Sequence, residues 1–229
     1  MDIFEPPAIT SSQQSLLEGH LRGVLEANKV HNLTRIDAWE DGLLLHVEDS
    51  LVGLPEIQDA PAGRYADLGT GGGFPGVPVA IMTGRETLLV DSVQKKMAAV
   101  QEIVDSLGLS ASVSTYGGRI EDLAKEMPQA FAVISARALS ALPSLLELAV
   151  PLLQEGGRLV CYKSQLPDNE LEHARALEDK LAMRLVSERH VLLSDGATER
   201  CIVVFERCGE PRVKLPRRVG SAQKNPYRA

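Results

Sequence analysis

The sequence predicts an α/β protein with a doubly wound, mostly parallel sheet, an antiparallel last strand and an N-terminal helical extension. Strand-like and helix-like patterns alternate from residue 63 to residue 207. A glycine-rich turn joins the first strand of this region to its helix. The last two apolar segments flank Asp195 and Gly196, which is typical of a hairpin. We expect a single domain made of an extension (1–54), a core (63–207) and a basic tail (208–229).

Two helices are expected before the sheet. Residues 10–28 place Ser11 and Gln14 at capping-box spacing ahead of an apolar stripe. Residues 37–51 begin at Asp37, a typical cap, and gather leucines toward one face. The composition of residues 55–63 indicates a linker.

The core elements follow as short apolar runs separated by helical patterns. We expect strands at residues 64–69, 86–91, 110–116, 131–135, 158–163, 189–194 and 199–207. We expect helices at residues 76–82, 92–107, 141–153 and 168–185. Pro78 suits the first turn of its helix, because an N–H is left unpaired there in any case. Gly108 is placed to end the helix 92–107.

Composition excludes several classes of protein. Of 229 residues, 44% are hydrophobic and 24% are charged, which excludes a disordered or fibrous chain. No apolar run is long enough to span a membrane, and the segment MDIFEPPAIT lacks the features of a signal peptide. The three cysteines and five histidines show no metal-ligand spacing. We expect a cytoplasmic protein with reduced thiols, no metal and no membrane partner.

Charge is distributed unevenly along the chain. The net charge is −7, yet residues 207–229 hold seven Lys or Arg and one acidic residue. A basic tail on an acidic body is typical of a protein with an anionic partner, and a solvated end that aids solubility gives the same pattern. Charge alone leaves both interpretations open. Pro211, Pro216 and Pro226 discourage a helix in the tail, so we expect it to run extended over the surface.

The glycine-rich turn indicates a nucleotide-like ligand. Gly71, Gly73 and Gly76 satisfy the dinucleotide pattern G-x-G-x-x-G. Equally, Asp67 begins the pattern D-x-G-x-G-x-G through Gly69, which resembles the first motif of S-adenosylmethionine-dependent methyltransferases. A carboxylate here would repel a pyrophosphate but attract the ammonium and sulfonium of S-adenosylmethionine. The methyl donor is therefore favoured, and a purely structural turn is the remaining alternative.

Asp91 supports the same interpretation. It ends the next strand, where its carboxylate can accept hydrogen bonds from ribose hydroxyls. Each of these residues also has a structural alternative: Asp67 could cap the turn, and Asp91 could cap the following helix.

Longer segments resemble one known family. These segments are HNLTRID, HVEDSL, DLGTGGGFPGVPVAI, LLVDSVQKKMAAVQEIVDSLGL, VISARALSALPSLLELAVPLLQEGGRLVCYKS, ERCIVVFER and LPRRVGSAQKNP. Together, over residues 28–226, they resemble the bacterial small-subunit ribosomal RNA methyltransferase G family (RsmG, also called GidB). Phe-Pro-Gly, S-A-R-A and P-R-R-x-G are the more specific features. The three consecutive glycines depart slightly from the family pattern, and the first 27 residues match little.

The resemblance implies a class I methyltransferase fold and methyl transfer from S-adenosylmethionine to N7 of a guanine in 16S ribosomal RNA, at rRNA position 527. It implies that Gly69 and Phe74 lie in the donor site, that Asp91 binds ribose, and that Ile120 and Glu121 edge the adenine pocket. It also implies that Arg137 contacts the donor. Without it, Phe74 could be core and Arg137 a surface ion pair.

The expected partner is 16S rRNA or the small ribosomal subunit, and we expect the protein to be a monomer. Candidate RNA contacts are Asn32, His46, Lys163, Arg200, Arg217 and Arg218. For the two tail arginines, packing back on the body as a structural clasp is the alternative. Because N7 of neutral guanine has a lone pair and no proton, we expect positioning and no catalytic acid or base.

Two other functions stay open on the residues alone. The same glycine turn suits a nicotinamide-dependent oxidoreductase, although no proton donor for the hydride site stands out. A non-catalytic RNA-binding module on a degenerate methyltransferase fold is the other, against which the intact glycines and Asp91 argue.

Overall fold

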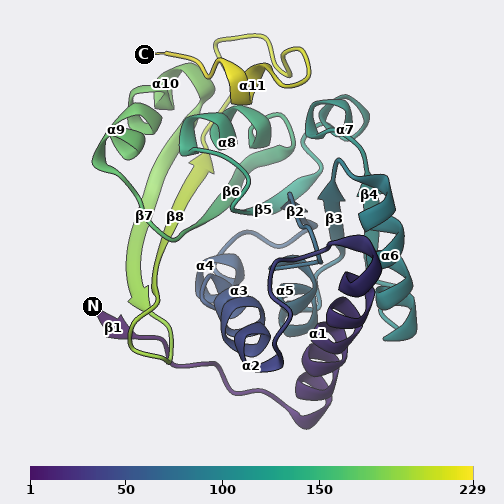
Figure 1. The fold of residues 1–229 in the computed structure, drawn as a ribbon. Coiled ribbons are helices and arrows are strands. Elements are labelled where there is room, and N and C mark those ends of the chain that lie inside the picture. Colours follow the sequence, from purple (N-terminus) through teal and green to yellow (C-terminus); the bar gives the residue numbers. More distant parts are fainter. Residues whose placement is uncertain (229) are drawn as a thin grey trace.

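The computed structural model describes residues 1–228, which form one eight-stranded sheet with helices on both faces (Figure 1). The strand order is β1-β7-β8-β6-β5-β2-β3-β4. The strands are β1 (Asp2–Ile3), β2 (Tyr65–Leu68), β3 (Thr87–Asp91), β4 (Val113–Gly117), β5 (Phe131–Arg137), β6 (Leu153–Lys163), β7 (Met183–Leu192) and β8 (Glu199–Arg207).

The expected sheet is confirmed. Strands β2 to β6 pair in parallel, and β8 runs antiparallel to both β6 and β7. The strand β1 was not expected, because two residues carry no periodic pattern. It pairs in parallel with β7, and the N–H of Phe4 extends the pairing by donating to the carbonyl of Leu192 at 2.7 Å. The N-terminal extension is thereby joined to the core sheet.

The helices divide between the two faces of the sheet (Figure 1). Side chains alternate along β2, so that Ala66 and Leu68 face one layer and Tyr65 faces the other. The layer around Tyr65 contains α1 (Ser11–His31), α2 (Trp39–Gly42), the π-helix η1 (Leu43–Glu48), α3 (Asp49–Leu51), α4 (Leu54–Gln58), α5 (Gly76–Thr83) and α6 (Gln94–Ser106). The opposite layer contains α7 (Ile120–Glu126), α8 (Leu142–Ala149), α9 (Asp168–Ala176), α10 (Glu178–Leu181) and α11 (Ser221–Lys224).

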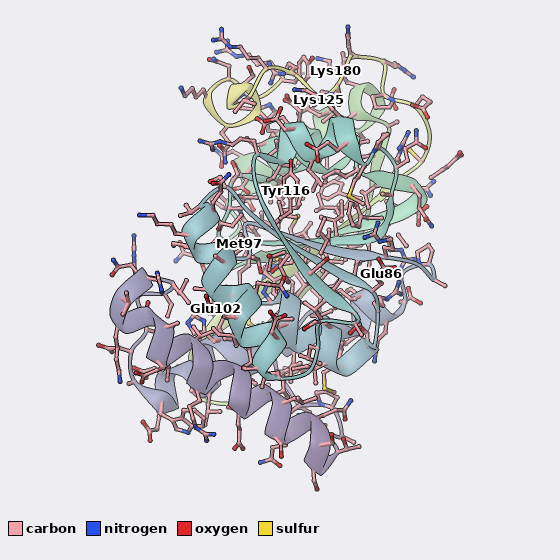
Figure 2. All side chains as sticks on the ribbon, turned by 90° about the vertical axis from the view of Figure 1, so that its right-hand side faces the viewer. Glu86, Met97, Glu102, Tyr116, Lys125 and Lys180 are labelled. Atoms are coloured by element: carbon pink, nitrogen blue, oxygen red, sulfur yellow. The ribbon has the colours of Figure 1, made fainter. Side chains whose placement is uncertain are left out.

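Helix α1 packs tightly on α6, as Figure 2 shows from the side. A Cβ atom at Gly19 would lie 2.9 Å from Leu107, and one at Gly23 would lie 2.9 Å from Ile103. Because real Cβ contacts do not come that close, these two glycines permit the close approach of the two helices.

Three expected boundaries in the N-terminal half and core are wrong. The segment 55–63 is not all linker, because Pro55 fits the first turn of α4. The helix expected at 37–51 begins at Trp39 and contains the π-helical stretch η1. The helix expected at 141–153 ends at Ala149, since Leu153 already pairs with Phe131 in the sheet.

Two expectations near the C-terminus are also wrong. The helix expected at 168–185 ends at Leu181, because Ala182 adopts a left-handed conformation (φ 51°) and Met183 begins β7. The tail, expected to run extended, forms the short helix α11 after Gly220. The end of the helix at Leu181 is decided by the pairing of β7 with a distant strand, which local helix propensity does not predict.

Candidate functional site

The candidate site lies at the carboxyl ends of β2, β3 and β5. The chain winds outward in opposite directions on the two sides of β2, and such a switch point leaves a crevice. Three adjoining pockets occupy it. The first, of about 470 Å³, lies between Asp91, Gly118, Ile120, Glu121, Leu148 and Gln223. The second, of about 760 Å³, lies between Thr34, His46, Gly71, Phe74, Asp91 and Arg137. The third, of about 880 Å³, lies between His46, Asp49, Arg137, Tyr162, Lys163 and Arg200.

The glycine turn forms the floor between the first two pockets. Gly69, Gly71 and Gly73 have φ values of +74°, +56° and +91°, which favour glycine. A Cβ atom on Gly69 would lie 2.8 Å from Leu139, so that position also has no room for a side chain. Gly69 lines both pockets, and Gly71 lines the second. The backbone is therefore open to close approach by a ligand.

Asp67 holds this turn from below. It is fully buried; its Oδ2 accepts from the N–H of Gly76 at 3.0 Å, and its Oδ1 accepts from the Ser135 hydroxyl at 2.6 Å. Burial raises the pKa of Asp67, and the hydrogen bond from Ser135 opposes that rise. It lines none of the three pockets. This geometry favours the alternative in which Asp67 caps the turn.

Asp91 lies where its expected role requires. It ends β3 and lines both the first and the second pocket. Its Oδ2 accepts from the N–H of Gly71 at 3.3 Å, and its Oδ1 accepts from the N–H of Val93 at 2.9 Å. The carboxylate therefore both orients the glycine turn and borders two adjoining pockets.

Phe74 is packed between two histidines. Its ring is stacked on that of His46, with the ring centres 4.4 Å apart and an interplanar angle of 8°. The ring of His20 is tilted against it, and the centres of these two rings are also 4.4 Å apart. Burial lowers the pKa of His20 to about 3 and that of His46 to about 4, so both rings are neutral at pH 7. Phe74 is thus core and pocket wall at once, and the role of His20 was not predicted.

A buried carboxylate organises the cations of the third pocket. Asp49 accepts from Arg137 at 2.9 Å and from Arg200 at 2.7 Å. Arg137 also donates to the carbonyl of Leu45 at 3.1 Å. Asp49 is only 2% exposed. No role for Asp49 was predicted from the sequence, because its partners lie 88 and 151 positions away in the chain.

His46 links this cluster to the second pocket. Its Nδ1 is 3.4 Å from Arg137 and its Nε2 is 2.7 Å from the Thr34 hydroxyl. Since the arginine can only donate, Nδ1 accepts and Nε2 carries the proton.

The remaining candidates fall in different places. Lys163 lines the third pocket and pairs with Glu170 at 2.7 Å. Asn32 is exposed and ends α1 in a left-handed conformation, which explains an asparagine there. Arg217 pairs with the buried Glu147 through two bonds of 2.5 Å, while Arg218 is exposed and its side chain forms no ion pair within residues 1–228. This geometry favours the clasp alternative for Arg217 and leaves Arg218 available.

Ile120 and Glu121 begin α7 and line the first pocket. Glu121 is buried. It accepts from the N–H of Gly220 at 2.6 Å, a contact between residues 99 positions apart. The tail residue Gln223 lines the same pocket and was not predicted.

Two further observations concern metals and membranes. Glu188, His190 and Cys201 bring possible ligand atoms within 4.8 Å of one another, and they line none of the three pockets. The sequence did not indicate this cluster, because β7 and β8 bring His190 opposite Cys201.

None of the helices within residues 1–228 combines the length and the apolar composition that crossing a membrane requires.

Solved structures share the fold. A [4+2]-cyclase, SpnF, matches with a TM-score of 0.58 and 15% identity, covering 91% of this chain and 99% of that one. A geranyl diphosphate methyltransferase, solved with sinefungin, matches with a TM-score of 0.56 and 14% identity over 86% of this chain and 100% of that one. At these identities the likeness shows the class I methyltransferase fold alone, and SpnF illustrates that one fold serves different reactions.

Curated relatives are much more similar. The ribosomal RNA small subunit methyltransferase G of Carboxydothermus hydrogenoformans is 31% identical, covering 96% of this chain and 94% of its own. The enzyme of that name from Desulfitobacterium hafniense is 33% identical over 89% of this chain and 84% of its own. The enzyme of that name from Synechococcus elongatus is 32% identical, covering 93% of this chain and 90% of its own. Residues 13–198 match the family model GidB, described as rRNA small subunit methyltransferase G, and the chain belongs to that family.

Proposed function

We propose that this chain transfers a methyl group from S-adenosylmethionine to N7 of a guanine in 16S ribosomal RNA, at rRNA position 527. Membership of the rRNA small subunit methyltransferase G family supports the reaction and the type of substrate. The same membership gives no support to the nicotinamide-dependent and non-catalytic alternatives. The proposal extends to action as a monomer in the cytoplasm, where bacterial ribosomes lie.

The residues of the first two pockets fit the methyl donor. The positive φ values of the turn and the crowding at Gly69 leave a cradle that a Cβ atom would fill. In the proposed site Asp91 accepts from the ribose hydroxyls, and Ile120 and Glu121 border the adenine. When bound, S-adenosylmethionine supplies the methyl group on a positively charged sulfur. The neutral rings of His20 and His46 add no charge that would repel it.

The third pocket suits the RNA side. Arg137, Lys163 and Arg200 place three cations around it, and each is held by a carboxylate, Asp49 or Glu170. Held cations lose little conformational freedom when a phosphate binds, which favours orientation of the nucleotide. His46 and Arg137 line both the second and the third pocket, so the two spaces adjoin. The chain's task is then to align N7 with the methyl group and exclude water, which needs no general base.

One observation carries this assignment within the family: Asp91 and the left-handed glycines form one surface at the switch point of the sheet. The test has two parts. Calorimetry should detect binding of S-adenosylhomocysteine and none of NAD. Incubation with labelled S-adenosylmethionine and small subunits lacking the modification should place one methyl on N7 of the target guanine by mass spectrometry. Binding of NAD instead, or methylation elsewhere, would contradict the proposal.

A further inference from the structure

The C-terminal segment Arg217–Tyr227 is folded back on the body, where it borders the first pocket. It lies along α8 (yellow, at the top of Figure 2), and Gln223 of α11 lines the pocket together with Leu148 of α8. Ala222 is only 2% exposed, and its carbonyl accepts from the Ser144 hydroxyl at 2.8 Å. One side of the pocket is therefore built by the last residues of the chain.

An ion pair between Arg217 and the buried Glu147 anchors this segment. Arg217 donates to both oxygens of Glu147 on α8, and its guanidinium also donates to the carbonyl of Asn225 at 2.8 Å. The same guanidinium lies 4.1 Å from the centre of the Tyr227 ring. Removal of Arg217 would leave the carboxylate of Glu147 buried and unpaired, so the pair holds the segment in one position.

The segment also reaches Glu121. The N–H of Gly220 donates to Glu121 Oε1 at 2.6 Å, and Gly220 adopts a left-handed conformation (φ +77°) to begin α11. Glu121 Oε2 has no hydrogen-bond partner within residues 1–228. One carboxylate oxygen is thus held by the tail, and the other is available to accept a hydrogen bond in the pocket.

We propose that the segment Arg217–Tyr227 is a wall of the donor pocket that positions Glu121 for the adenine amino group and covers the adenosine with Gln223. This inference rests on the proposed function, which places the adenosine in the first pocket. Gly220 and Gln223 are positioning residues here. Because the same residues dock the tail and contact the donor, each event strengthens the other by the same factor.

A pair of matched amide variants tests the wall. Gln223→Ala should weaken binding of S-adenosylhomocysteine in calorimetry by about three- to tenfold, the range for loss of one hydrogen bond. Asn225→Ala removes an exposed amide from the same segment outside the pocket, and it should leave the affinity unchanged. The double variant Glu147→Gln with Arg217→Met removes both charges of the pair at once and should weaken binding by about tenfold or more, through loss of the charged hydrogen bond at Glu121.

Hydrogen exchange distinguishes the wall from a purely structural clasp, because a clasp without contact to the ligand would show the same exchange rates with and without it. S-adenosylhomocysteine should slow exchange of the amides of residues 217–225 in the wild-type protein. If the wild type binds the ligand but exchange there is unchanged and Gln223→Ala binds as Asn225→Ala does, the wall is refuted and the proposed function stands. If the wild type binds no ligand, the proposed function fails and the wall fails with it.

Discussion

Replacement of Asp91 by Ala tests the site most directly. The carboxylate lies at the end of β3, borders two pockets, and accepts from the N–H groups of Gly71 and Val93. Loss of hydrogen bonds to a charged acceptor costs about 1.5–3 kcal/mol, so the Kd for S-adenosylhomocysteine should rise about 10- to 150-fold. The bond from Gly71 is long, at 3.3 Å, and contributes little to that figure.

The fold should survive the change. Asp91 is only half-buried, and loss of its bond to Val93 costs about 1 kcal/mol in the free energy of unfolding. Calorimetry measures the affinity and urea unfolding measures the stability. Asp105→Ala, which removes an exposed acid from the following helix, controls for net charge. Unchanged affinity in Asp91→Ala at unchanged stability would refute the ribose role.

Three other predictions follow from the same geometry. Gly71→Val should abolish binding of S-adenosylhomocysteine and lower the free energy of unfolding by about 1–3 kcal/mol, because φ is +56° at that position. If calorimetry shows that the variant binds normally, the turn is only a connector between β2 and α5. As the pH falls from 6.5 toward 4, the free energy of unfolding should drop by up to about 1.4 kcal/mol per pH unit for each of His20 and His46, because the unfolded chain takes up protons that the folded rings, with pKa values of about 3 and 4, do not. Urea unfolding of His46→Asn should show a shallower dependence, and a slope equal to the wild type would contradict this. Arg218→Ala should lower the slope of log RNA affinity against log salt by about 0.7–0.9 at an unchanged melting temperature. Arg217→Ala should instead lower the free energy of unfolding by about 3 kcal/mol and leave that slope unchanged. An equal loss of slope in both variants would refute the assignment of Arg218 to RNA binding and of Arg217 to stability.

Local patterns were enough to predict the sheet and the glycine turn. Apolar runs with a period of two or of about 3.6 report which residues face a core, and Gly69, Gly71 and Gly73 report where the backbone must turn. Because parallel strands end at one edge of the sheet, this order also placed Asp91 beside the turn. Each of these signals is local, and Gly71 and Asp91 are only 20 positions apart.

Contacts between distant segments were decided only by the tertiary structure. Asp49 holds Arg137 and Arg200, Gly220 reaches Glu121, and β1 joins the sheet, although no local pattern announces these partners. For Asp67, the sequence predicted a charge facing the ligand, and burial turned that charge inward to Ser135 and Gly76. An ionised side chain has the same sequence signature whether it contacts a ligand, a phosphate or another side chain, because its partner is chosen by packing, burial and the pairing of charges that cannot stay buried alone.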